Sequence, residues 1–207
     1  MKRELIKEAA LDGFSLEELK SIGSFNNRYK YCLQMLGKPI GRGSSRIVFQ
    51  IDDEKVLKLA YNRKGIAQNE AEADWNMQNY GVVPILYEVD DDYMYIITEF
   101  VLQAKPEDFQ QCLGMSFEDF QKIVIMIYNQ YARRPLPTDM SWDTFNEVME
   151  NNDWLYQLDT FMSDYQLPFG DITRIANIGL CSRDGEAELV ILDNGLNDEV
   201  YNQYYSR

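Results

Sequence analysis

The 207-residue sequence contains no histidine, and this absence excludes several kinds of chemistry. Without an imidazole there is no Ser-His-Asp or Cys-His catalysis and no histidine-ligated metal site. Acid–base chemistry must then come from carboxylates, lysine or tyrosine. A bound metal ion should be a hard cation held by oxygen atoms.

Cysteine and long apolar runs are also scarce. The three cysteines, Cys32, Cys112 and Cys181, are isolated and odd in number, which argues against a disulfide framework and a C-x-x-C zinc site. No run of about 18 or more apolar residues occurs, so we expect no membrane association through a spanning helix. The first 14 residues, MKRELIKEAALDGF, lack the apolar stretch of a signal peptide, so we expect a cytoplasmic location.

Positive charge is in short supply, with 20 Lys and Arg against 34 Asp and Glu and a formal net charge of −14. We therefore expect no direct nucleic-acid binding, because phosphates would be repelled. An acidic surface keeps a protein soluble. It also allows an alternative in which the chain is an acidic inhibitor that fills the basic groove of a nucleic-acid-binding enzyme.

The order of the elements that the sequence predicts is rich in strands up to about residue 101 and rich in helices beyond it. This order indicates an α+β fold. Helices are predicted at residues 2–12, 15–20, 29–36, 65–80, from 106, at 116–132, 141–149 and 153–165, and strands at 47–51, 56–60, 83–89, 93–100, 178–181 and 189–192. Residues 166–177 read as a loop, residues 184–185 as a turn and the last residues as a polar tail with Tyr201, Tyr204 and Tyr205.

Residues 41–60, GRGSSRIVFQIDDEKVLKLA, form the stretch around which the chain is organised. Gly41 and Gly43 let backbone N–H groups approach an anion without hindrance from side chains. A strand, an acidic turn and a second strand follow, and side-chain alternation should direct Lys58 back towards the glycine turn. The stretch predicts a hairpin that sets a cation beside a phosphate-sized gap.

Five features follow one another in an order that resembles the protein-kinase-like superfamily, above all its compact members such as the small aminoglycoside-kinase-like and phage-encoded proteins. They are the glycine turn, the strand lysine, an acidic helix, an apolar strand ending TEFV and a late strand ending LDNG. The resemblance implies a bilobal fold with an antiparallel N-lobe sheet and a reduced, mainly helical C-lobe. The implied domains are an N-terminal helical extension (1–37), the N-lobe (38–101) and the C-lobe (102–207).

The resemblance also implies that ATP and Mg²⁺ are bound, and it assigns residues to each. The nucleotide-binding residues would be Gly41, Gly43, Ser44, Ser45, Val48, Lys58, Glu72, Thr98, Glu99 and Val101. Lys58 would bind the α- and β-phosphates. Thr98 would lie at the back of the adenine pocket, with the Glu99 C=O and the Val101 N–H at the adenine edge.

In the family, the strand lysine pairs with a glutamate of the following helix, and two residues compete for this role. They are Glu70 and Glu72. We favour Glu72, because Gln68 and Asn69 should start the helix turn on the solvent side.

In the second half, the segment GDITRIAN is similar to the family's catalytic loop. Asp171 would be the catalytic base, and Asn177 and Asp193 would hold the metal ion. The chain departs from the family pattern in that six residues separate Asp171 from Asn177 where the family has five, Arg46 replaces the third loop glycine and Asn194 replaces a phenylalanine.

The resemblance implies a phosphotransferase that acts on a protein or on a small hydroxyl compound, in the host cytoplasm if the chain is phage-encoded. The departures from the pattern support a second hypothesis. The chain could be a pseudokinase, a binding module that uses the fold to hold a protein partner.

Overall fold

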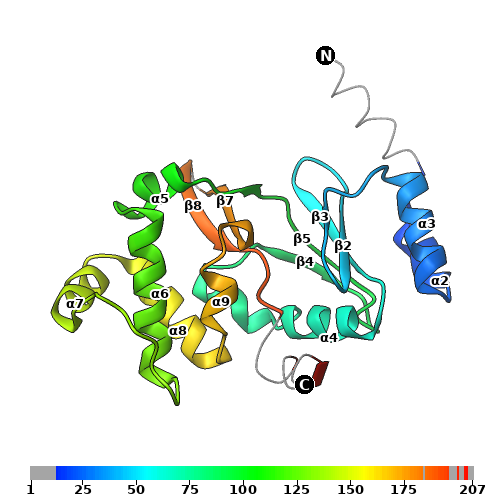
Figure 1. Cartoon of the computed structure of the whole chain (residues 1–207). Helices are drawn as coiled ribbons and strands as arrows, with labels where there is room; N and C mark the ends of the chain where they lie inside the picture. Colours follow the sequence, from blue (N-terminus) through cyan, green and yellow to red (C-terminus); the bar gives the residue numbers. More distant parts are fainter. Residues whose placement is uncertain (1–12, 184, 196–199, 201–202, 205–207) are drawn as a thin grey trace. The chain divides into compact units, whose positions relative to one another are not determined.

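The structure is a computed structural model, and it describes residues 13–183, 185–195, 200 and 203–204 (Figure 1). The helix predicted at residues 2–12, Asp184 of the last turn, and Tyr201 and Tyr205 of the tail lie outside these residues. Helices and antiparallel strand pairs occur together in the described part of the chain, which confirms the α+β class. Among the described residues, none of the helices has both the length and the apolarity needed to cross a bilayer.

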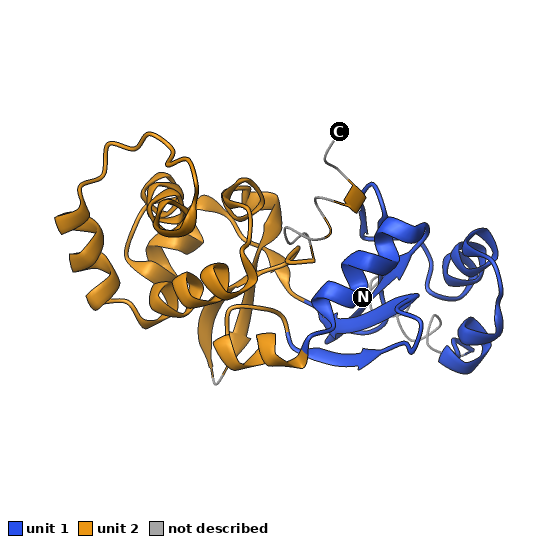
Figure 2. Cartoon of the chain, turned by 90° about the horizontal axis from the view of Figure 1, so that it is seen from below, with its two compact units in different colours: residues 1–74, 85–100 blue, residues 75–84, 101–207 orange. Residues whose placement is uncertain are grey.

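Contacts divide the chain into two compact units, which Figure 2 colours separately. Unit 1 comprises residues 1–74 and 85–100, and unit 2 comprises residues 75–84 and 101–207. The sequence-based boundaries after residues 37 and 101 divide the chain differently. The predicted N-terminal extension is counted with unit 1, and ten residues from the middle of the predicted N-lobe are counted with unit 2.

Unit 1 contains one five-stranded antiparallel sheet with the strand order β1-β2-β3-β5-β4. Its elements in chain order are α2 (Leu16–Ser21), α3 (Phe25–Met35), β1 (Gly41–Arg42), β2 (Arg46–Gln50), β3 (Lys55–Ala60), α4 (Arg63–Glu72), β4 (Leu86–Val89) and β5 (Tyr95–Glu99). The hairpin predicted for residues 41–60 is confirmed, with Val48 opposite Lys58. The strands predicted at 83–89 and 93–100 begin later, at Leu86 and Tyr95.

The two N-terminal helices pack on one face of this sheet. Leu19 of α2 and Cys32 of α3 belong to the same buried cluster as Phe49 and Leu57 of the sheet. The predicted cap of α2 is confirmed, because the Ser15 side chain accepts a hydrogen bond from the Glu18 N–H. Since side chains alternate along a strand, the residues between these apolar positions face the opposite side of the sheet, where α4 packs.

Helix α4 ends at Glu72, so the single helix predicted for residues 65–80 is wrong. Ala73 and Asp74 follow it, and residues Trp75–Tyr80 form a separate 3-10 helix, η1, in unit 2. Met77 of η1 is buried in the core of that unit. Packing of Met77 therefore overrides a helical pattern that the sequence carries on to Gly81.

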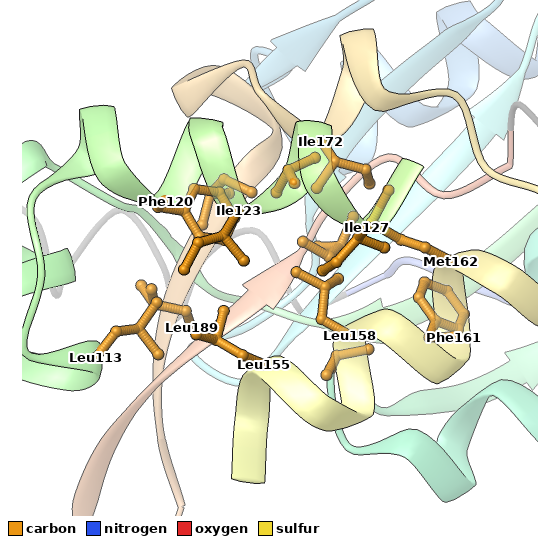
Figure 3. Packing of buried hydrophobic residues seen from close by; sticks show 14 of the residues in the cluster. Leu113, Phe120, Ile123, Ile127, Leu155, Leu158, Phe161, Met162, Ile172 and Leu189 are labelled. Atoms are coloured by element: carbon orange, nitrogen blue, oxygen red, sulfur yellow. The ribbon is translucent and has the colours of Figure 1, made fainter. Parts of the chain in front are cut away.

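Unit 2 combines helices with a three-stranded antiparallel sheet in the order β6-β7-β8. Its further elements are β6 (Leu102–Gln103), α5 (Pro106–Leu113), α6 (Phe117–Tyr131), α7 (Trp142–Glu150), α8 (Asp153–Tyr165), α9 (Phe169–Ile172), the 3-10 helix η2 (Ile175–Asn177), β7 (Ile178–Arg183) and β8 (Glu186–Ile191). Figure 3 shows the core, in which Ile123 and Ile127 of α6 and Leu158 of α8 belong to one cluster with Leu189 of β8.

Residues 166–177 are not the loop that the sequence predicts, because α9 and η2 occupy most of them. Leu167 and Ile172 are buried in the core and hold this stretch in place. The Tyr131 hydroxyl of α6 also donates to the Leu167 C=O at 2.8 Å. Two apolar anchors five residues apart fix a compact helical conformation where the sequence predicts a loop.

Residues 81–83, between η1 and β4, are hydrogen-bonded to the β7–β8 hairpin of unit 2. The Ile191 N–H donates to the Val82 C=O at 2.8 Å. The Arg183 guanidinium donates to the Gly81 and Val83 carbonyls, each at 2.9 Å. Unit 2 thus contains a segment that comes from the middle of the chain of unit 1.

Gly65 of α4 lies close to the backbone of β3 and of the residue before β2. A Cβ atom added there would lie 2.3 Å from the Ser45 carbonyl oxygen and 3.0 Å from the Ala60 Cα. Alanine has a higher helix propensity than glycine. Gly65→Ala should nevertheless lower the free energy of unfolding by about 2 kcal/mol, because the added Cβ clashes with the backbone. Urea unfolding would measure this change.

Gly23→Ala is the matched control, because nothing lies within 4 Å of a Cβ added at Gly23. Its free energy of unfolding should stay close to that of the wild type. A Gly65→Ala variant as stable as the wild type would contradict this description of the helix–strand contact.

Candidate functional site

The glycine turn is fixed by hydrogen bonds to the two residues that follow β3. The Tyr61 hydroxyl donates to the Gly43 C=O at 2.8 Å and the Asn62 side chain to the Ser44 C=O at 3.2 Å. The Tyr61 N–H donates to the Ser45 C=O at 3.1 Å. Three successive carbonyls of the turn are therefore held by the segment that leads into α4.

The other predicted residues of the turn lie on β1 and β2. Gly41 of β1 is paired with Val48 of β2, and the Gly43 N–H donates to the Arg46 C=O at 2.9 Å. Ser45 is buried, and its hydroxyl donates to the Gln68 side chain of α4. The turn is thus tied to α4 by a side chain as well as by its backbone.

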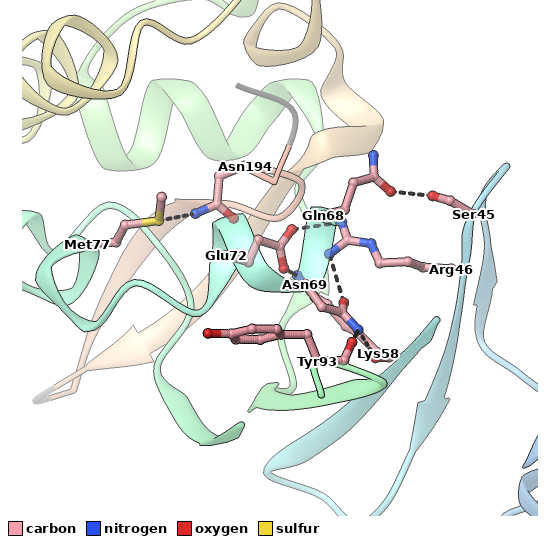
Figure 4. Close-up of polar contacts among 9 residues, drawn as sticks. All are labelled: Ser45, Arg46, Lys58, Gln68, Asn69, Glu72, Met77, Tyr93 and Asn194. Atoms are coloured by element: carbon pink, nitrogen blue, oxygen red, sulfur yellow. Dashed lines mark hydrogen bonds and ion pairs between the residues drawn. The ribbon is translucent and has the colours of Figure 1, made fainter. Parts of the chain in front are cut away.

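The centre of the site is the Glu72 carboxylate, which receives a different cation on each oxygen (Figure 4). The Lys58 Nζ lies 2.7 Å from Oε2, and the Arg46 Nη2 lies 2.7 Å from Oε1. All three side chains are more than nine-tenths buried. Lys58 stands on β3, Arg46 begins β2 and Glu72 ends α4, so the cluster joins the helix to two strands.

This environment sets the ionisation of Glu72. Burial alone would raise the pKa of its carboxyl group, but the charges and hydrogen bonds of Arg46 and Lys58 outweigh burial. They lower the pKa of Glu72 from 4.5 to about 2. The carboxylate is therefore ionised throughout the physiological pH range, and so it can hold both cations.

The structure pairs Lys58 with Glu72, while Glu70 is exposed on α4. The reason given from the sequence was wrong, because Gln68 and Asn69 are buried and face the cluster instead of solvent. The Asn69 side chain accepts from Arg46 at 3.3 Å and donates to the Lys58 C=O at 3.3 Å and the Tyr93 C=O at 2.9 Å. Asn69 therefore links α4 to β2, to β3 and to the residues before β5.

The residues predicted at the adenine edge fall on both sides of the boundary between the units. Thr98 and Glu99 belong to β5 of unit 1, and Val101 begins the second stretch of unit 2. Thr98 is buried, and its hydroxyl has no hydrogen-bond partner in the described part of the chain. The Glu99 side chain accepts from the Ile85 N–H at 3.1 Å, so it is engaged just before the start of β4.

Asp171 and Asn177 lie close together in unit 2. Asp171 is in α9, and its backbone C=O accepts a hydrogen bond from the Asn177 side chain at 3.1 Å. Its carboxylate accepts from Arg174 at 3.3 Å. Burial raises the pKa of Asp171 above 3.8, the negative charge of Asp193 raises it further, and the positive charge of Arg174 lowers it.

Asp193 follows β8, and the backbone fixes its position relative to Asn177. The Leu192 N–H donates to the Asn177 C=O at 2.8 Å. Asp171, Asn177 and Asp193 thus bring two carboxylates and one amide oxygen to one region of unit 2, a donor set that suits a hard cation such as Mg²⁺. Within the described ranges, no group of three or more Cys, Asp or Glu side chains could hold a metal ion.

Asn194, which stands where the resemblance has a phenylalanine, is buried beside η1. Its side-chain amide donates to the Met77 sulfur at 3.1 Å (Figure 4). A polar residue with a sulfur acceptor thus fills a position where an aromatic ring was expected.

Sequence reasoning missed the residues that support the cluster of Glu72. Gln68, Asn69 and Glu72 are spaced i, i+1 and i+4, so they share one helix face, and this spacing was a usable signal. From its sequence position, Arg46 is identified only as the replacement of the third loop glycine. Its partner lies 26 residues away, and no local pattern connects them.

Comparison of the chain with protein-family models, with curated proteins and with solved structures finds no match. Its function therefore has to be inferred from its own residues.

Glu72 should make the stability of the protein depend on acid pH. Because its pKa is lowered on folding, its contribution is complete above about pH 4.5 and is lost as the pH falls towards 2. Between pH 7 and pH 2.5 the wild type should lose about 2–3 kcal/mol more unfolding free energy than Glu72→Gln. Urea unfolding at a series of pH values would measure both curves.

Glu70→Gln is the control for this experiment, because Glu70 is exposed on the same helix and outside the cluster. Its curve should follow that of the wild type. Parallel curves for the wild type and Glu72→Gln would show that the buried carboxylate does not titrate as described.

The pKa of Asp171 should depend on the negative charge of Asp193. Asp193→Asn should lower the pKa of Asp171 towards 3.8, because a repelling negative charge is removed. Arg174→Gln should raise it, because an attractive positive charge is lost. Carboxyl ¹³C NMR titration would measure both shifts, with exposed Asp143→Asn as the control, and an unchanged pKa of Asp171 in Asp193→Asn would contradict the coupling.

Proposed function

We propose that the chain is a kinase-like phosphotransferase that uses ATP and Mg²⁺ and acts on a hydroxyl group of a protein or a small molecule. The observation that carries this proposal is the buried ion pair between Lys58 and Glu72. Protein kinases have their phosphate-binding lysine on the third strand and pair it with a glutamate of the next helix. Here Lys58 lies on β3 and Glu72 on α4, the helix that follows.

Unit 2 supports the same function by the order and chemistry of its polar residues. Asp171, Asn177 and Asp193 follow one another as do the base and the two metal ligands of the kinase motifs. The electrostatic coupling of Asp171 to Asp193 supports their closeness within the unit. The two carboxylates repel each other, and binding of a cation there would relieve this repulsion.

Each residue then has a stated role. Lys58 binds the α- and β-phosphates, and Glu72 keeps its ammonium group oriented. The turn from Gly41 to Ser45 covers the phosphates, Thr98 lies behind the adenine, and Glu99 and Val101 bind the adenine edge through their backbone groups.

When bound, Mg²⁺, with Asp193 and Asn177 as ligands, would neutralise charge on the phosphates. The acceptor hydroxyl oxygen forms a bond to the γ-phosphorus, and the bond from this phosphorus to the oxygen that stays with ADP breaks. Asp171 takes the proton of the hydroxyl group. The raised pKa of Asp171 makes it a stronger base than an exposed aspartate.

A second candidate function is nucleotide or partner binding without phosphoryl transfer, as in a pseudokinase. Arg46, in place of the third loop glycine, and the six-residue spacing between Asp171 and Asn177 favour it. The enzyme transfers the γ-phosphoryl group of ATP to an acceptor, and the pseudokinase does not.

A thermal-shift titration with ATP and MgCl₂ tests nucleotide binding. The melting temperature of the wild type should rise with ATP concentration, with a stabilisation of about 1.4 kcal/mol at ten times Kd. Lys58→Met and Asp193→Asn should abolish the rise, because each removes a group that binds phosphate or metal. Arg63→Met and Asp143→Asn, which make the same charge changes at exposed positions, should keep it.

The absence of any shift at millimolar ATP would overturn the proposal. An assay of ADP formation with candidate acceptors separates the two functions. A shift without transfer, unaffected by Asp171→Asn, would support the pseudokinase. Transfer that Asp171→Asn removes would support the enzyme.

A further inference from the structure

Arg46 occupies a position that the resemblance gives to a flexible glycine, yet its side chain is among the most constrained in unit 1. It is 7% exposed, and it contacts two residues of α4. The Nη2 atom lies 2.7 Å from the Glu72 Oε1, and the Nη1 atom donates to the Asn69 Oδ1 at 3.3 Å. The planar guanidinium can hold both groups at once, which a lysine ammonium cannot do in this geometry.

The two cations do not compete for Glu72. Lys58 bonds Oε2 and Arg46 bonds Oε1, so removal of either cation leaves the other oxygen paired. In a simple lysine–glutamate pair, a lysine that turns away leaves a buried carboxylate uncompensated, which is strongly unfavourable. Here Arg46 still neutralises the charge of Glu72 when the Lys58 side chain turns away.

Arg46 also closes the glycine turn. Its C=O accepts from the Gly43 N–H, and the neighbouring Ser45 hydroxyl donates to Gln68 of α4. Turn and helix are therefore joined by the adjacent residues Ser45 and Arg46, which contact Gln68, Asn69 and Glu72 of α4 (Figure 4). Any movement of α4 away from the sheet would break the Arg46 contacts together with those of Ser45.

We propose that Arg46 is a positioning residue that holds Glu72, and with it helix α4 and the glycine turn, in place independently of Lys58. Its bearing on catalysis rests on the proposed function. The consequence is that the phosphate site of unit 1 is assembled before any nucleotide binds. Lys58 can then turn towards the phosphates without loss of the helix position.

Amide hydrogen exchange of the full chain without nucleotide tests this directly. In Lys58→Met, amides of residues 43–47 and 63–72 should exchange within about twofold of the wild type, because Arg46 still holds Glu72. In Arg46→Met they should exchange about tenfold faster, because α4 loses the Arg46 contacts to both Glu72 and Asn69. Arg46→Lys should restore part of the protection, since it keeps the charge but loses the contact to Asn69.

Arg63→Met is the matched control, because Arg63 is an exposed cation at the start of α4. The proposal fails if Arg46→Met exchanges like this control, or if Lys58→Met loosens α4 as much as Arg46→Met does. Circular dichroism covers the case in which a variant does not fold. An unfolded Arg46→Met beside a folded Lys58→Met supports the proposal, and the reverse contradicts it.

Steady-state kinetics add the catalytic readout. Arg46→Met should lower kcat about tenfold with little change in KM for ATP, because Lys58 still binds phosphate but is oriented less often. Arg46→Lys should recover part of kcat. If the wild type neither binds nor uses ATP, the proposed function fails while the exchange result still decides the role of Arg46. If the wild type is active and the exchange difference is absent, the role of Arg46 alone fails.

Discussion

The structure of unit 1 depends on the neutralisation of one buried negative charge. A carboxylate cannot remain ionised in the protein interior unless cations and hydrogen bonds surround it. Glu72 meets this condition with Arg46 and Lys58, and in doing so it fixes α4 against β2 and β3. Because α4 carries no strongly apolar face towards the sheet, polar contacts set its position. The N-terminal helices stabilise the other face of the sheet by apolar packing.

In unit 2, apolar packing holds the segment that carries Asp171 and Asn177. Asp171 and Asn177 stand on short elements, α9 and η2, which would not be stable alone. Leu167 and Ile172 anchor these elements in the core, and hydrogen bonds from Tyr131 and from Gln121 of α6 hold their backbone. The core and these hydrogen bonds therefore determine where Asp171 and Asn177 lie.

The sequence predicted those features whose causes are local. Caps at Ser15 and Ser116, the alternation in the hairpin and the helix at Asp153–Tyr165 all depend on neighbours within a few residues, and they are found. The motif order predicted a glutamate partner for Lys58 on the next helix and left Glu70 and Glu72 open, and the structure pairs Lys58 with Glu72. What failed depends on distant partners. The break after Glu72 comes from packing of Met77 in another unit, and the role of Arg46 comes from a helix 26 residues away.

The hydrogen bonds of residues 81–83 have a consequence for the synthesis of the chain. Their partners, Arg183 and Ile191, leave the ribosome about a hundred residues later, on the order of ten seconds at typical rates. The strands of unit 1 on both sides of this segment are complete long before that. During synthesis, residues 81–83 must therefore wait for these hydrogen-bond partners after the strands of unit 1 have been made. Because the two units alternate along the chain, no single cut could separate one whole unit from the other.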